Sequence, residues 1–340
     1  MVFYIRITSM VARFATWMCS SDLPGFPQDL KGVGTISHAM PLCNASLALA
    51  LASNCPASSW QDVITHAVAS PSMLFINAGA NKGFGANSFL QRFHSGWTVT
   101  SDQWHNFQTE QMQRTKRARN TIKGACGACH QCKDPPPQVV FGKANAKVIA
   151  IELMTSNSHL LQSTFRHFQV PGTVVHAAVG DVDGLGDIEP VLVKQGQENL
   201  GISIGSADGV DNLTRQVTLL SLDNLTASRG ISDVSWLTID TEGHDKHVLH
   251  GAVRLLSSRA VKVLEFEYHN LGAWRHSSVS KEVAWLQGFG YTCFWQSNKG
   301  ALSPFLPGCD YDFHWWSNVV CAHHRHAVQR LRTLVPVELQ

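Results

Sequence analysis

Short apolar runs alternate with amphipathic stretches from about residue 70 onward. The runs are rich in β-branched, aromatic and leucine side chains and lack a polar face, which is typical of strands buried in a parallel sheet. Between them, apolar residues recur at helical spacing, as in His244–Ser257. The pattern predicts an α/β fold in which a mostly parallel, twisted sheet carries helices on both faces. The predicted strands are Met73–Ile76, Val148–Ile151, Thr173–Val179, Trp236–Ile239, Val261–Phe266, Tyr291–Trp295 and Ser317–Cys321.

The same pattern divides the chain into regions. The main domain is predicted at residues 70–325, after a poorly patterned N-terminal extension at 1–69 and before a C-terminal tail at 326–340. A polar, charge-rich stretch at 96–147 interrupts the main domain early. It contains Pro135–Pro137, a run that fits neither a helix nor a central strand. We interpret residues 96–147 as an insertion with a small structure of its own.

Composition narrows the range of partners and compartments. With 27 Lys and Arg against 25 Asp and Glu in 340 residues, the chain lacks the basic excess of a nucleic-acid-binding protein. No uncharged apolar run has the length of a membrane-spanning helix. The apolar, acid-free start, which Arg6 and Arg13 interrupt, fits either an organelle or secretory targeting segment or an ordinary N-terminal segment. The cytoplasm is the default expectation.

Three of the nine cysteines lie close together in the predicted insertion. Cys126, Cys129 and Cys132 have a spacing that lets thiolates on one tight turn share a tetrahedral zinc ion, with His130 or a remote residue as the fourth ligand. The spacing favours a structural zinc site, and the alternatives are a redox or disulfide role or no special role. The odd cysteine count in a long chain does not fit the disulfide framework of a small secreted domain.

Small and polar residues stand where the first three strands end. A turn of small residues before a helix lets a nucleotide-like cofactor approach the backbone and the free N–H groups of the helix. The second strand ends in Glu152, which is either an acceptor for the two hydroxyls of a ribose or a surface Glu. The third ends near Asp181, either a polar group for an adenine ring or a turn residue. The candidate residues of the first turn are Asn77, Gly79, Asn81 and Gly83.

Ionisable residues are densest at the ends of the fourth and fifth strands. Asp240 and Glu242 alternate along extended backbone and can face one edge of the sheet, although an acid such as Glu242 is also favoured at a helix start. Glu267 and His269 share a face of the fifth strand by the period of two. His269 is either a general base, because the ordinary pKa of histidine is near neutral, or a hydrogen-bonded structural histidine.

Five segments carry a family resemblance when they are taken together and in order. They are Phe75–Gly83, Ser221–Leu225, Leu237–Gly243, Val248–Ala252 and Val263–Glu267. The set resembles the FkbM family of S-adenosylmethionine-dependent methyltransferases. The resemblance implies a Rossmann-like class I methyltransferase fold, S-adenosylmethionine as methyl donor and usually a hydroxyl oxygen as acceptor. Two departures are Asn77, where the family usually has Asp, and the long insertion before Glu152.

The resemblance also implies roles for single residues. The first turn would line the methionine and ribose end of the cofactor, Glu152 would hold the ribose hydroxyls and Asp181 would contact the adenine. Asp240 and Glu242 would face the transferred methyl group. We predict an in-line displacement in which Asp240 or His269 takes the proton of the acceptor hydroxyl and Glu242 orients the acceptor, a small molecule or a sugar.

Two other functions share part of this pattern. An NAD(P)-dependent oxidoreductase has the glycine turn and the ribose acid, but it does not predict Asp-Thr-Glu-Gly after the fourth strand, and the first turn lacks a clean Gly-x-Gly-x-x-Gly. A non-catalytic, degenerate methyltransferase-like binding protein would explain Asn77. Such a protein would have no need of Glu152 or of the glycine turn.

Overall fold

The structure is a computed structural model of the chain. It describes residues 43, 57–114, 134–188, 204–205, 215–306, 309, 311–312, 314 and 316–339, all of which belong to the unit Leu42–Gln340. The predicted zinc ligands Cys126, Cys129 and Cys132 and most of the predicted N-terminal extension lie outside these residues. No helix in the described part of the chain is long and apolar enough to cross a membrane.

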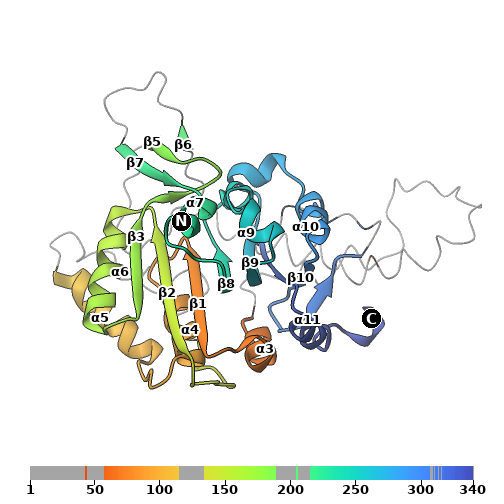
Figure 1. The fold of residues 1–340 in the computed structure, drawn as a ribbon, viewed down its shortest axis with the longest axis horizontal. Coiled ribbons are helices and arrows are strands. Elements are labelled where there is room, and N and C mark those ends of the chain that lie inside the picture. Colours follow the sequence, from red (N-terminus) through yellow and green to blue (C-terminus); the bar gives the residue numbers. More distant parts are fainter. Residues whose placement is uncertain are drawn as a thin grey trace, which may run out of the picture. The chain divides into compact units, whose positions relative to one another are not determined.

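One sheet of eight strands, in the order β11-β10-β12-β9-β8-β1-β2-β3, organises the described residues (Figure 1). The five strands from β9 to β3 are parallel, and β12 runs antiparallel between β9 and β10. The prediction of a mostly parallel α/β sheet is confirmed. The strands are β1 Ser72–Ala78, β2 Asn145–Glu152, β3 Gly172–His176, β8 Val234–Ile239, β9 Val261–Tyr268, β10 Thr292–Gln296, β11 Leu302–Pro304 and β12 Ser317–Ala322.

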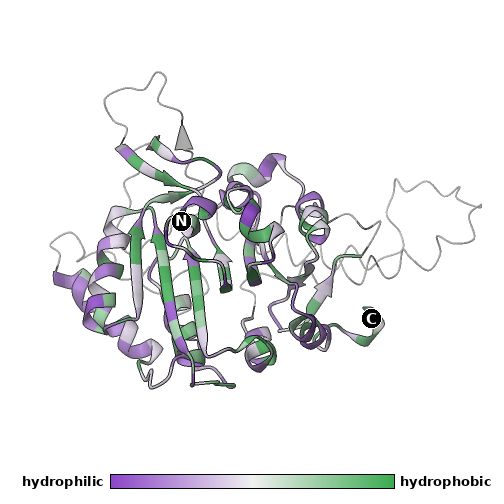
Figure 2. Ribbon diagram, viewed as in Figure 1, coloured by the Kyte–Doolittle hydropathy of each residue, from purple (hydrophilic) through white to green (hydrophobic). Residues whose placement is uncertain are grey.

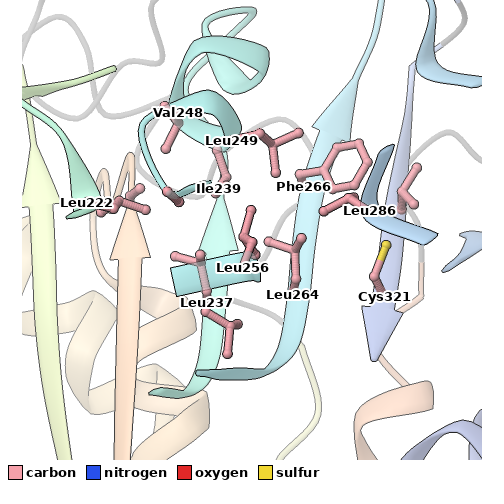
Figure 3. Close-up of a cluster of buried hydrophobic side chains, with 14 of the residues drawn as sticks. Leu222, Leu237, Ile239, Val248, Leu249, Leu256, Leu264, Phe266, Leu286 and Cys321 are labelled. Atoms are coloured by element: carbon pink, nitrogen blue, oxygen red, sulfur yellow. The ribbon is translucent and has the colours of Figure 1, made fainter. Parts of the chain in front are cut away.

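Neighbouring residues of one strand pack on opposite faces of this sheet because side chains alternate along extended backbone. Leu237 and Ile239 of β8 join one buried cluster, together with α7 to α10, whereas Trp236 joins a second cluster with α3, α4, α6 and α11. Figure 3 shows part of the first cluster, and Figure 2 shows the apolar central strands beside more polar helices. The helices are α3 Trp60–Val68, α4 Phe84–Phe93, α5 Ser101–Arg114, α6 Thr155–His167, α7 Leu222–Ser228, α8 Asp245–His250, α9 Val253–Ser257, α10 Val279–Gly288 and α11 Arg325–Arg332, with short 3₁₀ helices η3 Gly272–His276 and η4 Val337–Leu339.

Two predicted elements are broken in the structure. The predicted strand Thr173–Val179 ends as β3 at His176, and its last residues form β4 in a second sheet. The predicted helix His244–Ser257 is interrupted at Gly251, where an added Cβ atom would lie 1.8 Å from the carbonyl oxygen of Gly180. The backbone therefore passes so close to the Gly180 loop that no residue with a side chain fits at position 251. The second sheet, in the order β4-β7-β5-β6, consists of β4 Ala178–Val179, β5 Gly184–Ile188, β6 Ile204–Gly205 and β7 Arg215–Leu220.

Three helices lie outside the predicted main-domain pattern. In α3, Trp60 is fully buried and stacks on Trp236 of the central strand β8. Leu331 of α11 belongs to the same buried cluster. Trp104 of α5, inside the predicted insertion, is fully buried and donates to the carbonyl of Lys82. The predicted domain boundaries stay predictions, but all three helices pack on the core of the sheet.

In the described residues, two disulfides join cysteines that are far apart in the sequence. Cys43 is bonded to Cys309, and Cys293 is bonded to Cys321. The second pair occupies directly opposite positions on the antiparallel strands β10 and β12. The spacing of the cysteines did not indicate either pair, because the partners are brought together only by the sheet.

Asp223, in the motif Ser221–Leu225, joins α7 to the start of α9. Its carboxylate accepts the backbone N–H groups of Arg254 at 2.8 Å and Leu255 at 3.0 Å. The first N–H groups of a helix have no partner within the helix, so Asp223 caps α9 from another element. This motif residue thereby fixes α9 against the face of the sheet on which Leu222 and Leu256 are buried.

We expect Asp223→Ala to lower the free energy of unfolding by about 1–2 kcal/mol, the usual cost of losing a helix cap. The matched control is Asp233→Ala, because Asp233 is exposed and, within the described residues, pairs only with Lys262. A surface ion pair contributes at most about 1 kcal/mol. Urea unfolding at constant m-value measures both. Equal losses in the two variants would show that the cap contributes nothing.

Candidate functional site

The turn after β1 is shaped by residues with positive φ. Gly79, Asn81 and Gly83 have φ values of 81°, 45° and 75°. The backbone N–H groups of Gly79 and Ala80 both donate to the carbonyl of Ile151, at 3.0 and 2.9 Å, which anchors the turn to β2. An added Cβ atom on Gly79 would lie 1.7 Å from the carbonyl oxygen of Asp240. Glycine is therefore required both by the conformation and by the approach of the β8 backbone.

Glu152 stands at the end of β2 and is bonded to this turn. Its carboxylate accepts the backbone N–H of Asn81 at 2.7 Å and that of Met154 at 2.7 Å, one on each oxygen. Each carboxylate oxygen has a further lone pair for a hydroxyl donor. Burial raises the pKa of Glu152, although the two N–H groups and the charge of Lys82 oppose the shift. The predicted ribose acid is thus a buried carboxylate with spare acceptor capacity beside the glycine turn.

Asn77 and Asp181 are placed differently from the rest of the predicted cofactor residues. Asn77 is buried inside β1, where an added Cβ on Gly85 of α4 would lie 3.4 Å from its Nδ2 atom. Asp181 is exposed, and it accepts a hydrogen bond from Nδ1 of His247 in α8 at 3.0 Å. Burial opposes ionisation of Asp181, but the hydrogen bond and charge of His247 outweigh it and lower the pKa. The predicted roles of Asn77 and Asp181 stay predictions.

The ends of β8 and β9 bring four acids and one histidine together. Three potential ligand atoms, one each from Glu242, Glu267 and His269, lie within 4.8 Å of one another. Glu267 is also hydrogen-bonded to the side chain of Asp240. The charge of Asp245, which is fully buried, acts on both Glu267 and His269. The predicted catalytic residues Asp240, Glu242 and His269 therefore belong to one cluster, and their roles stay predictions.

Burial and mutual repulsion control the charges in this cluster. Burial raises the pKa of Glu267 well above the usual value, and the charges of Glu242 and Asp245 raise it further. Burial also raises the pKa of Asp245, although His269 and three backbone N–H groups oppose the shift. For His269, burial lowers the pKa and Asp245 opposes the shift. Burial therefore disfavours the charged forms of both Glu267 and Asp245.

Glu267 and Asp245 were not among the catalytic residues predicted from the sequence. The signal for Glu267 is an acid within an apolar strand, which is costly to bury unless the site uses it. Asp245 resembles an ordinary acid at a helix start, and α8 does begin there. Its carboxylate, however, accepts the backbone N–H groups of Thr241 and Gly243 at 3.2 and 3.1 Å, so it holds the turn that carries Glu242.

Residues 126–293 match the family model described as Methyltransferase FkbM domain. The chain contains an FkbM methyltransferase domain. The FkbM match spans Glu152, Asp181 and the whole cluster from Asp240 to His269, whereas β1 and the glycine turn precede it. No curated protein matches the chain. With the mostly parallel sheet, the FkbM domain confirms the predicted Rossmann-like methyltransferase fold and implies S-adenosylmethionine as cofactor.

We expect Gly79→Ala to destabilise the protein by at least about 2 kcal/mol, because left-handed backbone costs a non-glycine residue and the new methyl group would overlap the Asp240 carbonyl. Gly230→Ala is the matched control. Gly230 has a φ of 63°, but an added Cβ meets nothing within 4 Å. The control should lose only about 1–2 kcal/mol. Urea midpoints compare the two, and a smaller loss at Gly79 would contradict the close approach.

Proposed function

We propose that this protein transfers a methyl group from S-adenosylmethionine to a hydroxyl oxygen of a small molecule or sugar. The observation that carries the proposal is the arrangement of the sheet edge in an FkbM domain. The glycine turn contacts the ribose acid Glu152 on one side and the backbone of Asp240 on the other. A cofactor on this turn would lie between Glu152 and the acidic cluster.

The residues present fit this cofactor. Glu152 has an acceptor position left on each carboxylate oxygen, which suits the two hydroxyls of a ribose. The carboxylates that follow β8 would favour the positively charged sulfonium and ammonium groups of the cofactor. When bound, S-adenosylmethionine supplies an electrophilic methyl group, so the chain itself has to position the acceptor and accept a proton.

Asp240 is the better candidate for the base. It is half-buried at the end of β8, whereas only 6% of His269 is exposed. Asp240 is also hydrogen-bonded to Glu267, which holds its carboxylate at the edge of the sheet beside the acidic cluster. The Asp240 carboxylate would take the proton of the acceptor hydroxyl, and the half-buried Glu242 would orient that hydroxyl.

Isothermal titration of the full chain tests the cofactor. We expect saturable micromolar binding of S-adenosylmethionine and S-adenosylhomocysteine and no binding of NADH. Methyl-labelled S-adenosylmethionine and a panel of hydroxyl-bearing acceptors then test the transfer, with Asp240→Asn expected to lose at least about 100-fold in rate.

Binding of NADH alone would support an oxidoreductase instead. Binding of neither class of ligand would support the degenerate binding protein. A labelled methyl group on a nitrogen or carbon atom of the product would support methyl transfer but contradict a hydroxyl oxygen as the acceptor.

The affinity for S-adenosylmethionine should fall as the pH falls. The pKa of Glu152 is raised by burial, so its carboxylate takes up a proton at a higher pH than an exposed Glu does. Affinity should be full above this raised pKa and decrease as the pH falls through it. In Glu152→Gln, affinity should be about 10- to 100-fold lower, because a hydrogen bond to a charged group contributes about 1.5–3 kcal/mol. The variant should also lose this pH dependence. If its affinity still fell with pH as in the unaltered protein, Glu152 would not be the residue that binds the ribose.

A further inference from the structure

Some buried polar atoms near the end of β9 have no hydrogen-bond partner among the described residues. Glu267 and His269 are 7% and 6% exposed. Oε2 of Glu267 and both ring nitrogens of His269 have no hydrogen-bond partner in the part of the chain that the structure describes. A buried polar atom left without a partner costs about 1–3 kcal/mol, so two such side chains two residues apart call for a ligand. The proton transfer assigned to Asp240 uses none of these three atoms.

The spacing of these atoms suits a metal ion. Nε2 of His269 lies 3.2 Å from Oε2 of Glu267 without hydrogen-bond geometry. Two ligands that each stand about 2.0–2.2 Å from one ion are roughly 3–3.6 Å apart. Glu242 brings a third ligand atom, and all three lie within 4.8 Å of one another. A small movement of the Glu242 carboxylate toward Glu267 and His269 would place three ligand atoms around one face of an ion.

Neighbouring residues orient the two glutamates. Nε1 of Trp316 donates to Oε1 of Glu267, which leaves Oε2 facing His269. Glu242 has a φ of 55°, and Asp245 holds its turn through the N–H groups on either side. Hydrogen bonds of this kind fix the direction of metal ligands. The arrangement is therefore held by neighbouring residues rather than formed by two acids and a histidine that happen to be close.

We propose that Glu242, Glu267 and His269 hold a divalent cation of the first transition row at the carboxyl edge of the sheet. Two carboxylates balance the charge of such an ion, and one imidazole among oxygen ligands favours Mn²⁺ or its neighbours over Mg²⁺ and Ca²⁺. Three protein ligands leave coordination positions for an acceptor hydroxyl. That last role rests on the proposed methyl transfer, in which the ion would lower the pKa of the hydroxyl before Asp240 takes its proton.

Mn²⁺ alone, without S-adenosylmethionine, is the probe, because thiolates bind it weakly and the cysteines of the chain do not compete. The full chain is treated with a chelator, dialysed and titrated with Mn²⁺, and the electron paramagnetic resonance signal reports free Mn²⁺. We expect one saturable site, with Mg²⁺ binding at least about 10-fold more weakly. Glu267→Gln and Glu242→Gln should each weaken Mn²⁺ binding by about 10- to 100-fold.

Glu265→Gln is the matched control, because Glu265 is a buried acid on the same strand whose partners are Gln296 and Asn318. It should bind Mn²⁺ like the unaltered protein. Thermal unfolding checks each variant, and the half-buried Glu242 provides a test if Glu267→Gln does not fold. Absence of a saturable Mn²⁺ site, or unchanged binding in both glutamine variants, would overturn the cation site. Binding of S-adenosylmethionine without Mn²⁺ binding would overturn this inference alone, whereas Mn²⁺ binding without cofactor binding would overturn only the methyl transfer.

Discussion

The contact between the turn after β1 and the end of β8 is the constraint on which the site depends. The N–H of Asp240 donates to the carbonyl of Ala78 at 2.9 Å, and the next residue, Gly79, has no room for a side chain against the Asp240 carbonyl. The two strands thus stay paired up to the point where both turn. Because the same turn is bonded to Ile151 and Glu152 of β2, three strand ends are fixed relative to one another.

This geometry concentrates acids where burial is strongest. Strands that are covered on both faces place ionisable groups most readily at their ends, and parallel strands present these ends at one edge. Glu152 meets the resulting cost with two backbone N–H donors, and Asp245 does so with the N–H groups of its own turn. Glu267 receives one donor from Trp316 and lies beside His269 and the charges of Glu242 and Asp245, so its Oε2 atom is where the proposed cation would bind.

The sequence predicted the strand ends well because apolar runs and their first polar residue are local features. Glu152, Asp240 and Glu242 follow their strands as expected, and the spacing of Glu267 and His269 placed both on one face. Contacts between distant segments could not be predicted in this way. The lack of room for a side chain at Gly251 depends on the Gly180 loop, and the burial of Trp60 depends on Trp236. The disulfide partners Cys293 and Cys321 meet only because β12 inserts beside β10.

Asp245 shows why a correct local interpretation can be incomplete. An acid at the first position of α8 satisfies the rule for helix starts, and this rule alone would assign Asp245 to stability. Its position at the end of a buried parallel sheet gives the same carboxylate a second effect. By accepting N–H groups on both sides of Glu242, it keeps that residue in left-handed backbone and directs it toward β9. Asp245 therefore stands at the start of α8 and also fixes the position of Glu242. The stability and the chemistry of this edge of the sheet depend on the same residue.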